Sequence, residues 1–207
     1  MEKLIEIPDI VVGRLPLYLR ALQRMAQNSQ QVTSSQELGE RLGISAAQIR
    51  KDLSQFGEFG KQGTGYGIEF LIQQLQSILK VDRVWDVVVV GAGDVGHGIA
   101  RYQGFRNRGF RVAMVLDNDS HKIGAQIGEF VVQSMDDLAD KITKTGIKVA
   151  MLAVPANVAQ QVADELVKAG IRAILNYAPT NIIVPPGVQV QHIDPATHLQ
   201  RMAYYLE

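Results

Sequence analysis

A glycine-rich segment has the residue types and spacing needed to hold a dinucleotide. Gly91, Gly93 and Gly96 form a GxGxxG pattern directly after the β-branched run at residues 87–90. The first glycine permits a tight turn, the second lets the backbone approach a pyrophosphate, and the third allows close helix–strand packing. A helix that begins at this loop points free N–H groups and a positive dipole end at the phosphates. A strand before the glycines and a helix after them raise the specificity of the pattern.

An acidic residue downstream indicates which dinucleotide is bound. Asp117 ends a predicted strand at residues 111–116 and lies 21 residues after Gly96. A carboxylate about 20 residues beyond the glycines accepts hydrogen bonds from the adenosine ribose, and it would repel a 2′-phosphate. No arginine follows, since the next residues are Asn118 and Asp119. With the glycines, Asp117 predicts NAD(H) rather than NADP(H); alone it is equally compatible with a solvated turn acid.

A second group of residues, nearer the N-terminus, has the chemistry of DNA recognition. We expect a helix from residue 46 to about residue 56, with apolar residues on one side. Its opposite side carries Ala47, Arg50, Lys51 and Ser54. A recognition helix needs such an apolar back and a face of donors, because Arg and Lys neutralise phosphates or read guanine edges, and Ser and Gln add hydrogen bonds.

Capping signals place a short helix just before this one. Ser34 followed by Glu37 is a capping box, Gly43 is a natural helix stop, and Ser45 followed by Gln48 repeats the cap pattern. Two short helices joined by a tight glycine-containing turn are typical of a helix-turn-helix. The same pattern is also found in helical hairpins that bind no DNA.

Residues 56–67 contain alternating glycines and aromatics and are expected to form the β-hairpin of a winged helix, with Lys61 near its tip. From Arg14 to Tyr66 there are seven Lys/Arg against four Asp/Glu, whereas the whole chain has zero net charge. The charge balance therefore excludes a wholly basic DNA-coating protein and permits a local basic face. The DNA-binding candidates are Ser34, Ser35, Ala47, Gln48, Arg50, Lys51, Ser54, Lys61 and Tyr66.

Strands and helices alternate after the glycine loop. We expect strands at residues 130–132, 149–154 and 173–175, with a helix at residues 157–169 between the last two. Such alternation predicts a doubly wound parallel sheet, the Rossmann architecture, in which ligands bind at the carboxyl ends of the strands. That rule adds Val154, Pro155 and Asn176 to the dinucleotide candidates.

The end of the chain is predicted to form a strand at residues 188–193 and a helix that begins after Asp194. One face of this helix carries Leu199, Met202, Ala203 and Leu206. An apolar helix without an evident place in the Rossmann core indicates a dimer contact. Docking back onto its own domain is the alternative that the pattern leaves open.

The composition limits the classes of function. The chain has 207 residues, of which 46% are hydrophobic and 20% charged, and it contains no cysteine. A globular protein without disulfides, thiolate metal sites or a thiol redox switch is expected, and the four histidines show no ligand-like pairing. The N-terminal segment lacks a signal-peptide core and no apolar run reaches the ~20 residues of a membrane span, which predicts a cytoplasmic protein without a membrane partner.

These features together resemble the Rex family of redox-sensing transcriptional repressors over nearly the whole chain. The stretches that carry the resemblance are residues 14–20, 33–35, 48–54, 56–66, 91–96, 152–156 and 174–179. The resemblance implies a homodimer with exchanged C-terminal helices that binds operator DNA when NADH is scarce and releases it when NADH closes the dimer. Gln55, where the family commonly has an aromatic residue, and residues 128–131 depart from the pattern.

The resemblance also implies a switch set near the nicotinamide: Arg14, Tyr102 and Asp194. Oxidised nicotinamide carries a positive charge and the reduced ring is neutral. An acid that can contact either the ring region or an arginine would therefore change its contact, and with it the conformation, when the charge of the ring changes. Each of the three also has a purely structural interpretation: Arg14 as a surface charge, Tyr102 as an aromatic that packs against a helix, and Asp194 as a helix cap. The full dinucleotide set is Gly91, Ala92, Gly93, Asp94, Val95, Gly96, Asp117, Val154, Pro155, Asn176, Tyr102 and Asp194.

The sequence thus predicts an α/β protein with three segments. A winged helix-turn-helix domain (residues 1–82) precedes a Rossmann NAD(H)-binding domain (residues 83–187), and residues 188–207 form a strand and a domain-swapped dimerisation helix. Too little chain remains for a catalytic domain, so we expect no enzyme, no catalytic residues and no metal. A small NAD-dependent dehydrogenase and a nucleotide-binding regulatory subunit that never contacts DNA are the rival interpretations.

Overall fold

The computed structural model describes residues 7–60, 63–136 and 138–206, and divides into two compact units, Met1–Arg83 and Val84–Glu207. Lys61, predicted at the tip of the wing, lies outside the described residues. The strand predicted near residue 190 belongs to the sheet of the second unit and does not form a separate segment with the last helix. Among the described residues, no helix is long and apolar enough to cross a bilayer.

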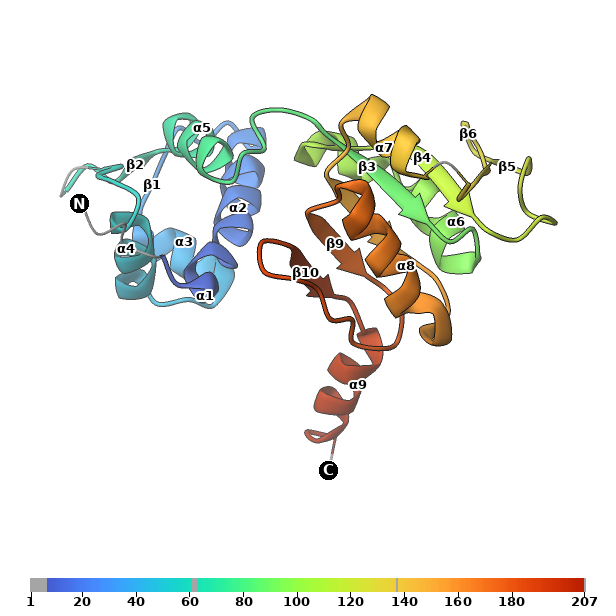
Figure 1. The fold of residues 1–207 in the computed structure, drawn as a ribbon. Coiled ribbons are helices and arrows are strands. Elements are labelled where there is room, and N and C mark those ends of the chain that lie inside the picture. Colours follow the sequence, from blue (N-terminus) through green and yellow to red (C-terminus); the bar gives the residue numbers. More distant parts are fainter. Residues whose placement is uncertain (1–6, 61–62, 137, 207) are drawn as a thin grey trace. The chain divides into compact units, whose positions relative to one another are not determined.

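The first unit is mainly helical (Figure 1). Its elements are α1 (Asp9–Val12), α2 (Leu15–Gln27), β1 (Val32–Thr33), α3 (Ser35–Leu42), α4 (Ala46–Ser54), β2 (Tyr66–Gly67) and α5 (Ile68–Ile78). The apolar stripes of α2 and α5 face each other, and α3 and α4 close the core with Leu38, Ile49 and Leu53. The helical periodicity therefore buries one face of each helix.

The predicted hairpin wing has a different strand pairing. β2 pairs with β1, which precedes the two recognition-motif helices, with Thr33 opposite Tyr66. Residues 57–60 contain no strand. The prediction of a local hairpin is therefore wrong for the described part of residues 56–67, because β2 pairs with β1 and not with another strand of this segment.

The second unit is built on a six-stranded parallel sheet in the order β10-β9-β8-β3-β4-β7. Its strands are β3 (Trp85–Val90), β4 (Phe110–Asp117), β7 (Gln133–Ser134), β8 (Val149–Leu152), β9 (Ala173–Asn176) and β10 (Gln189–His192). The order reverses between β3 and β8, the point where doubly wound sheets bind ligands. The carboxyl ends of these two strands lead into the glycine loop and into Ala153–Pro155, as the sequence predicted.

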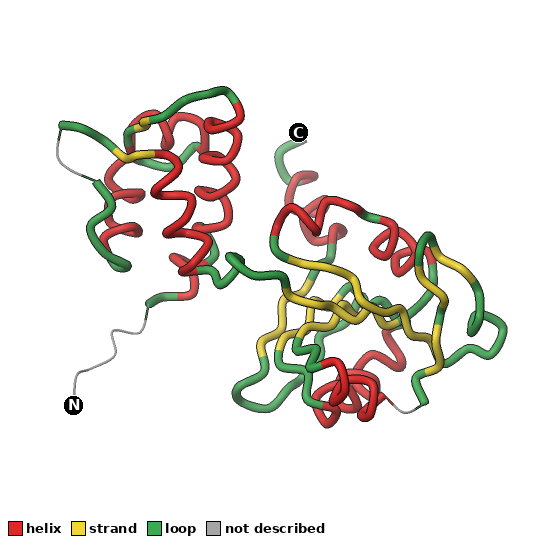
Figure 2. The backbone as a smooth tube through the Cα atoms, turned by 90° about the horizontal axis from the view of Figure 1, so that it is seen from above, coloured by secondary structure: helices red, strands yellow, loops and turns green. Residues whose placement is uncertain are grey.

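Helices cover both faces of this sheet, as Figure 2 shows from above. They are α6 (Asp94–Arg101), the 3₁₀ helix η1 (Gln103–Arg108), α7 (Leu138–Thr145) and α8 (Ala156–Ala169). The unit also contains a last helix, α9 (Pro195–Ala203), which is not one of these covering helices. Val88 and Val90 pack in the core with α7 and α8, while Val87 and Val89 pack in the core with α6. This alternation explains why β3 is a continuous apolar run.

Two elements differ from the expectation. Phe130–Val131 (β6) forms a small antiparallel hairpin with Gln126–Ile127 (β5), and the third strand of the sheet is β7, two residues paired with Leu116 and Asp117. The last helix, α9, leads away from the sheet (Figure 1), and none of its residues is buried. Docking of α9 onto its own domain is therefore not what the structure shows.

Candidate nucleotide and nucleic-acid sites

The three glycines of the loop have different local environments. Gly91 has φ 102°, and a Cβ there would overlap the carbonyl oxygen of Ala153. A Cβ on Gly96, in the first turn of α6, would overlap the carbonyl oxygen of Gly91. A Cβ on Gly93 would meet no heavy atom within 4 Å. The first and third glycines thus serve turn geometry and packing, whereas the second leaves space for a ligand to approach the backbone.

Asp117 is tied to this loop and is only 6% exposed. Its carboxylate accepts hydrogen bonds from the backbone N–H of Ala92 (2.7 Å) and of Asp119 (2.9 Å), and Lys122 Nζ lies 3.3 Å away. Burial raises the pKa of Asp117, but the two backbone hydrogen bonds and Lys122 outweigh it, so the pKa lies below its ordinary value. The residue is therefore an ionised acceptor at neutral pH.

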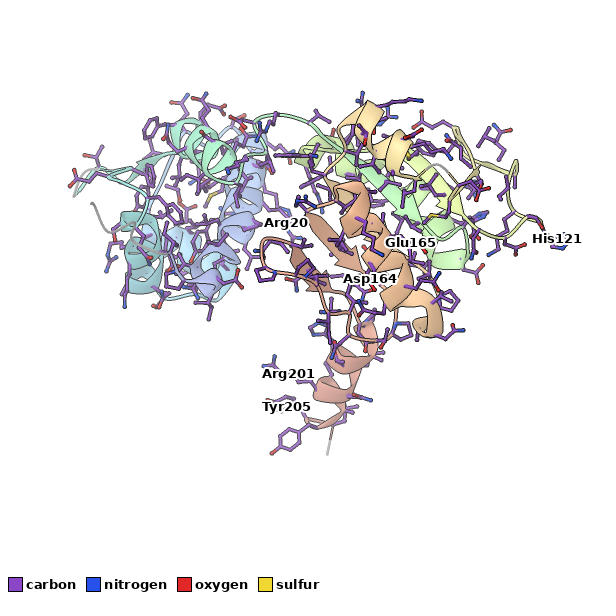
Figure 3. The ribbon with its side chains drawn as sticks, in the orientation of Figure 1. Arg20, His121, Asp164, Glu165, Arg201 and Tyr205 are labelled. Carbon is purple, nitrogen blue, oxygen red and sulfur yellow. The ribbon has the colours of Figure 1, made fainter. Side chains whose placement is uncertain are left out.

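A cavity of about 570 Å³ lies over the glycine loop, within the size range of cofactor sites. It is lined by seven of the predicted residues: Gly91, Gly93, Asp94, Val95, Asp117, Val154 and Pro155. The sequence did not indicate Lys122, Met135, Gln161 or Glu165, which also line it. Glu165 lies on α8 beside Asp164 (Figure 3). The helical spacing of Asn157, Gln161 and Glu165 was the available signal, because one face of α8 supplies all three.

Other predicted dinucleotide residues do not line this cavity. Gly96 and the Ala92 side chain are buried at the loop. Asn176 is fully buried, donates to the carbonyl oxygen of Thr180 (2.8 Å) and accepts from the N–H of Ala178 (3.0 Å), which stabilises the turn after β9. Tyr102 packs edge-on against Phe105 and borders a separate small pocket. Asp194 caps α9 by accepting from the N–H of Ala196 (2.9 Å).

The serine half of each predicted helix-turn-helix cap forms, whereas the Glu37 carboxylate accepts from Gln30, Thr33 and Arg41 instead of closing a capping box. Ser34 Oγ accepts from the N–H of Glu37, and Ser45 Oγ accepts from the N–H of Gln48. Gly43 is left-handed with φ 68° and ends α3. Gly39 was not singled out, yet a Cβ there would overlap the carbonyl oxygen of Ile44. The close approach of the turn to α3 therefore depends on Gly39 as well as on Gly43.

The predicted outer face of α4 is exposed: Ala47, Arg50, Lys51 and Ser54 all point to solvent. Arg50 Nη1 donates to Ser35 Oγ at 2.9 Å, so Ser35 is largely buried and holds a donor of the recognition helix. Arg50 and Ser54 border a groove of about 430 Å³ whose other side includes Gly60 and Tyr66. The recognition helix and the described part of the wing segment therefore share one surface.

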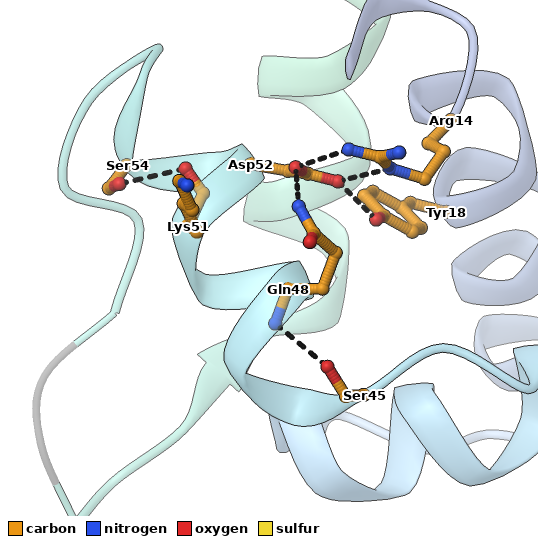
Figure 4. A network of polar contacts seen from close by, with 7 residues as sticks. All are labelled: Arg14, Tyr18, Ser45, Gln48, Lys51, Asp52 and Ser54. Atoms are coloured by element: carbon orange, nitrogen blue, oxygen red, sulfur yellow. Dashed lines mark hydrogen bonds and ion pairs between the residues drawn. The ribbon is translucent and has the colours of Figure 1, made fainter. Parts of the chain in front are cut away.

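A buried carboxylate lies behind this face. Asp52, on α4, is 0% exposed and accepts two hydrogen bonds from Arg14, at 2.6 and 2.7 Å, and one each from Tyr18 Oη (2.6 Å) and Gln48 Nε2 (2.7 Å) (Figure 4). Burial raises the pKa of Asp52, but these donors together lower it below its ordinary value. Burial and the hydrogen bond to Asp52 raise the pKa of Tyr18. Arg14, predicted as a switch residue, is thus bound to the recognition helix.

Groups of acids and histidines that are suited to a metal ion are absent from the described residues. The two sites are accordingly a cavity at the switch point of a parallel sheet, which contains the glycine loop and an ionised acid, and a capped, donor-bearing helix in the other unit. The first suits a phosphate-containing ligand with a ribose, and the second suits a nucleic-acid duplex.

Comparisons with known proteins agree with both assignments. Residues 6–54 match the family described as putative DNA-binding protein N-terminus, and residues 82–180 match the CoA binding domain family. The chain is 52% identical to the redox-sensing transcriptional repressor Rex of Roseiflexus sp. (strain RS-1), covering 100% of this chain and 94% of that protein. It is 43% identical to the repressor Rex of Streptomyces coelicolor, covering 96% of this chain and 77% of the relative.

Solved structures give the same result. The structure of RSP in complex with β-NAD⁺ and operator DNA superposes with a TM-score of 0.92 at 36% identity, covering 97% of this chain and 92% of the other. RSP in complex with β-NADH gives a TM-score of 0.87 at 33% identity, covering 99% and 95%. RSP is described as a Rex-family repressor. With such identity over its full length, this chain belongs to the Rex family of redox-sensing transcriptional repressors.

Proposed function

We propose that this protein is a transcriptional repressor that senses the NADH/NAD⁺ ratio, binds operator DNA as a homodimer in the cytoplasm, and releases the DNA when NADH binds. The observation that supports this most is the coexistence in one chain of the Asp117 cavity and the exposed donor face of α4. Relatives that share both units are named as redox-sensing repressors, and RSP was solved with β-NAD⁺ and operator DNA and with β-NADH.

The dinucleotide acts here as a signal. The relatives are named as transcriptional repressors, and this chain is likewise a repressor and not an enzyme. The loop N–H groups at Gly91–Gly96 would hold the pyrophosphate, and Asp117 would accept from the ribose hydroxyls. Its low pKa keeps a negative charge where a ribose phosphate of NADP(H) would lie.

The homodimer is proposed to form through α9. Leu199 and Met202 lie three residues apart on this helix and are 64% and 63% exposed, and Tyr204 and Leu206 are exposed just beyond it. Arg201 and Tyr205 project from the same segment (Figure 3). Burial of such an apolar face against a second copy would gain about 25 cal/mol for each Å² removed from water.

The switch is proposed to use Arg14 of the first unit with Tyr102 and Asp194 of the second. The positive charge of oxidised nicotinamide and the neutrality of the reduced ring give Asp194 different electrostatic surroundings in the two states. An effector shifts an equilibrium only by its different affinity for the two conformations, so this charge difference is the available source of that affinity.

The experiment is a titration of the full-length protein against a labelled palindromic duplex, followed by fluorescence anisotropy. We expect binding without nucleotide and with NAD⁺, release with NADH, and no release with NADPH or coenzyme A at equal concentration. Failure to bind any duplex would leave the regulatory-subunit alternative. Steady oxidation of NADH with carbonyl substrates would support the dehydrogenase alternative.

A further inference from the structure

In the recognition helix α4, the orientation of the Gln48 side chain is fixed by a hydrogen bond to the buried Asp52. Gln48 is the third residue of α4, and its backbone N–H donates to Ser45 Oγ at 3.2 Å. Its side-chain Nε2 donates to Asp52 Oδ1 at 2.7 Å (Figure 4). Both the backbone and the amide of Gln48 are therefore held in place before any DNA arrives.

The carboxylate of Asp52 permits only one orientation of the Gln48 amide. A carboxylate only accepts hydrogen bonds, and Asp52 is held as a carboxylate by the guanidinium of Arg14 and the hydroxyl of Tyr18. A flipped amide would place Gln48 Oε1 against Asp52 Oδ1, acceptor against acceptor, inside a buried network. Gln48 Nε2 must therefore face Asp52, which directs Oε1 away from it.

Gln48 lies near the N-terminus of the recognition helix, so the orientation of its amide affects which base edge it can contact. Recognition helices contact base edges with their N-terminal residues; Gln48 is half-buried there, between the exposed Ala47 and Lys51. In the major groove, adenine N6 and cytosine N4 are donors, whereas guanine O6 and N7 and thymine O4 are acceptors. An amide that presents its oxygen will accept from the first pair and repel the second.

We infer that Asp52 is a specificity-determining positioning residue: by binding Gln48 Nε2 it makes Gln48 read an amino group, adenine N6 or cytosine N4, at one position of each operator half-site. This inference rests on the proposed function, because it assumes that α4 enters the major groove. Asp52 itself touches no base; it acts through Gln48.

The test is competitive binding of the full-length protein to duplex pools in which every operator position is varied in turn. For the wild type, one position per half-site should favour adenine or cytosine on the contacted strand by roughly 5- to 20-fold. Gln48→Ala should lose this preference at that position and keep those elsewhere. Asp52→Asn should reduce it to about twofold, because an asparagine NH₂ can donate to Gln48 Oε1 and let the amide turn.

Tyr18→Phe is the matched control. It removes another hydrogen bond to Asp52 and leaves the Asp52–Gln48 contact, so the preference should persist. Equal relaxation in Tyr18→Phe and Asp52→Asn would overturn the inference, since general loosening of the network would explain both. Retention of every preference by Gln48→Ala would overturn it too. A wild type that binds no duplex would instead contradict the proposed function.

Asp52→Asn leaves Arg14 without its anion, so this variant can unfold. In that case the side-chain NH₂ resonances of Gln48 in the free wild-type protein decide the orientation. We expect one proton shifted downfield and protected from exchange with solvent. Two protons with the shifts and exchange of an exposed amide would overturn the inference.

Discussion

Arg14 and Asp52 are 38 residues apart in the chain and form a two-point ion pair, with Nε to Oδ2 at 2.6 Å and Nη2 to Oδ1 at 2.7 Å. This pair ties the start of α2 to the recognition helix. Loss of the Arg14 guanidinium would leave the buried Asp52 carboxylate without its cation, with Tyr18 and Gln48 still donating to it.

The first prediction concerns stability. Arg14→Ala should destabilise the first unit by about 2–3 kcal/mol, because removal of one partner of a buried pair leaves an uncompensated charge. Hydrogen exchange of the α2 and α4 amides measures this locally. The control is Arg41→Ala, which breaks the exposed pair with Glu37 and should cost less than ~0.5 kcal/mol. Equal effects of the two variants would contradict the importance of the buried pair.

The second prediction is a pH dependence. The folded-state pKa of Asp52 is lowered, so its contribution to stability is full above the unfolded value of about 3.9 and is lost as pH falls through the lower folded value. Thermal melts between pH 7 and pH 3 should show a steeper acid loss for the wild type than for Asp52→Asn. Parallel curves would show that Asp52 does not titrate in this way.

The third prediction separates two glycines of one motif. Gly93→Ala should leave the melting temperature within about 2 °C and weaken NADH binding at least ~10-fold, because the new methyl group meets no protein atom and occupies ligand space. Gly96→Ala should instead lower the melting temperature, since its methyl group overlaps the Gly91 carbonyl oxygen. NADH titrations beside thermal melts distinguish them. Unchanged NADH affinity in Gly93→Ala would place the pyrophosphate elsewhere.

The fourth prediction concerns nucleotide choice. Asp117→Asn keeps an acceptor for the Ala92 N–H and removes the charge, so the preference for NADH over NADPH should fall about 10-fold. Asp119→Asn is the control: Asp119 is half-buried, lines the same cavity and also lies near Lys122, so its replacement removes a nearby charge and should retain the preference. Calorimetric titration with both nucleotides measures the ratio. A preference that survives in Asp117→Asn would assign selectivity to another residue.

The fifth prediction concerns assembly. Leu199→Asp should raise the dimer dissociation constant at least ~10-fold by placing a charge on the apolar face of α9. Gln200→Glu puts a charge on the adjacent position of the same helix and should leave the dimer intact. Sedimentation at several concentrations measures both. A Leu199→Asp protein that stays as tightly dimeric as the wild type would exclude α9 as the main contact.

Features that depend on local sequence were predictable, and those that depend on distant partners were not. Ser34, Ser45 and Gly43 act on backbone groups within four residues, and GxGxxG and Asp117 have a fixed spacing, so pattern alone located them. The role of Asp52 depends on Arg14 and Tyr18, 38 and 34 residues away. The pairing of β2 with β1 and the hydrogen bond from the Ala92 N–H to Asp117, 25 residues away, likewise arise only when the chain folds.

The central claim is that operator DNA and NADH oppose each other's binding, and thermodynamic linkage tests it most directly. If NADH weakens operator binding by some factor, operator DNA must weaken NADH binding by the same factor. The measurement is the NADH dissociation constant of the full-length protein with and without saturating operator. We predict a value at least ~10-fold higher with operator, and no such change for NAD⁺. An NADH dissociation constant that is the same in both conditions would contradict the account.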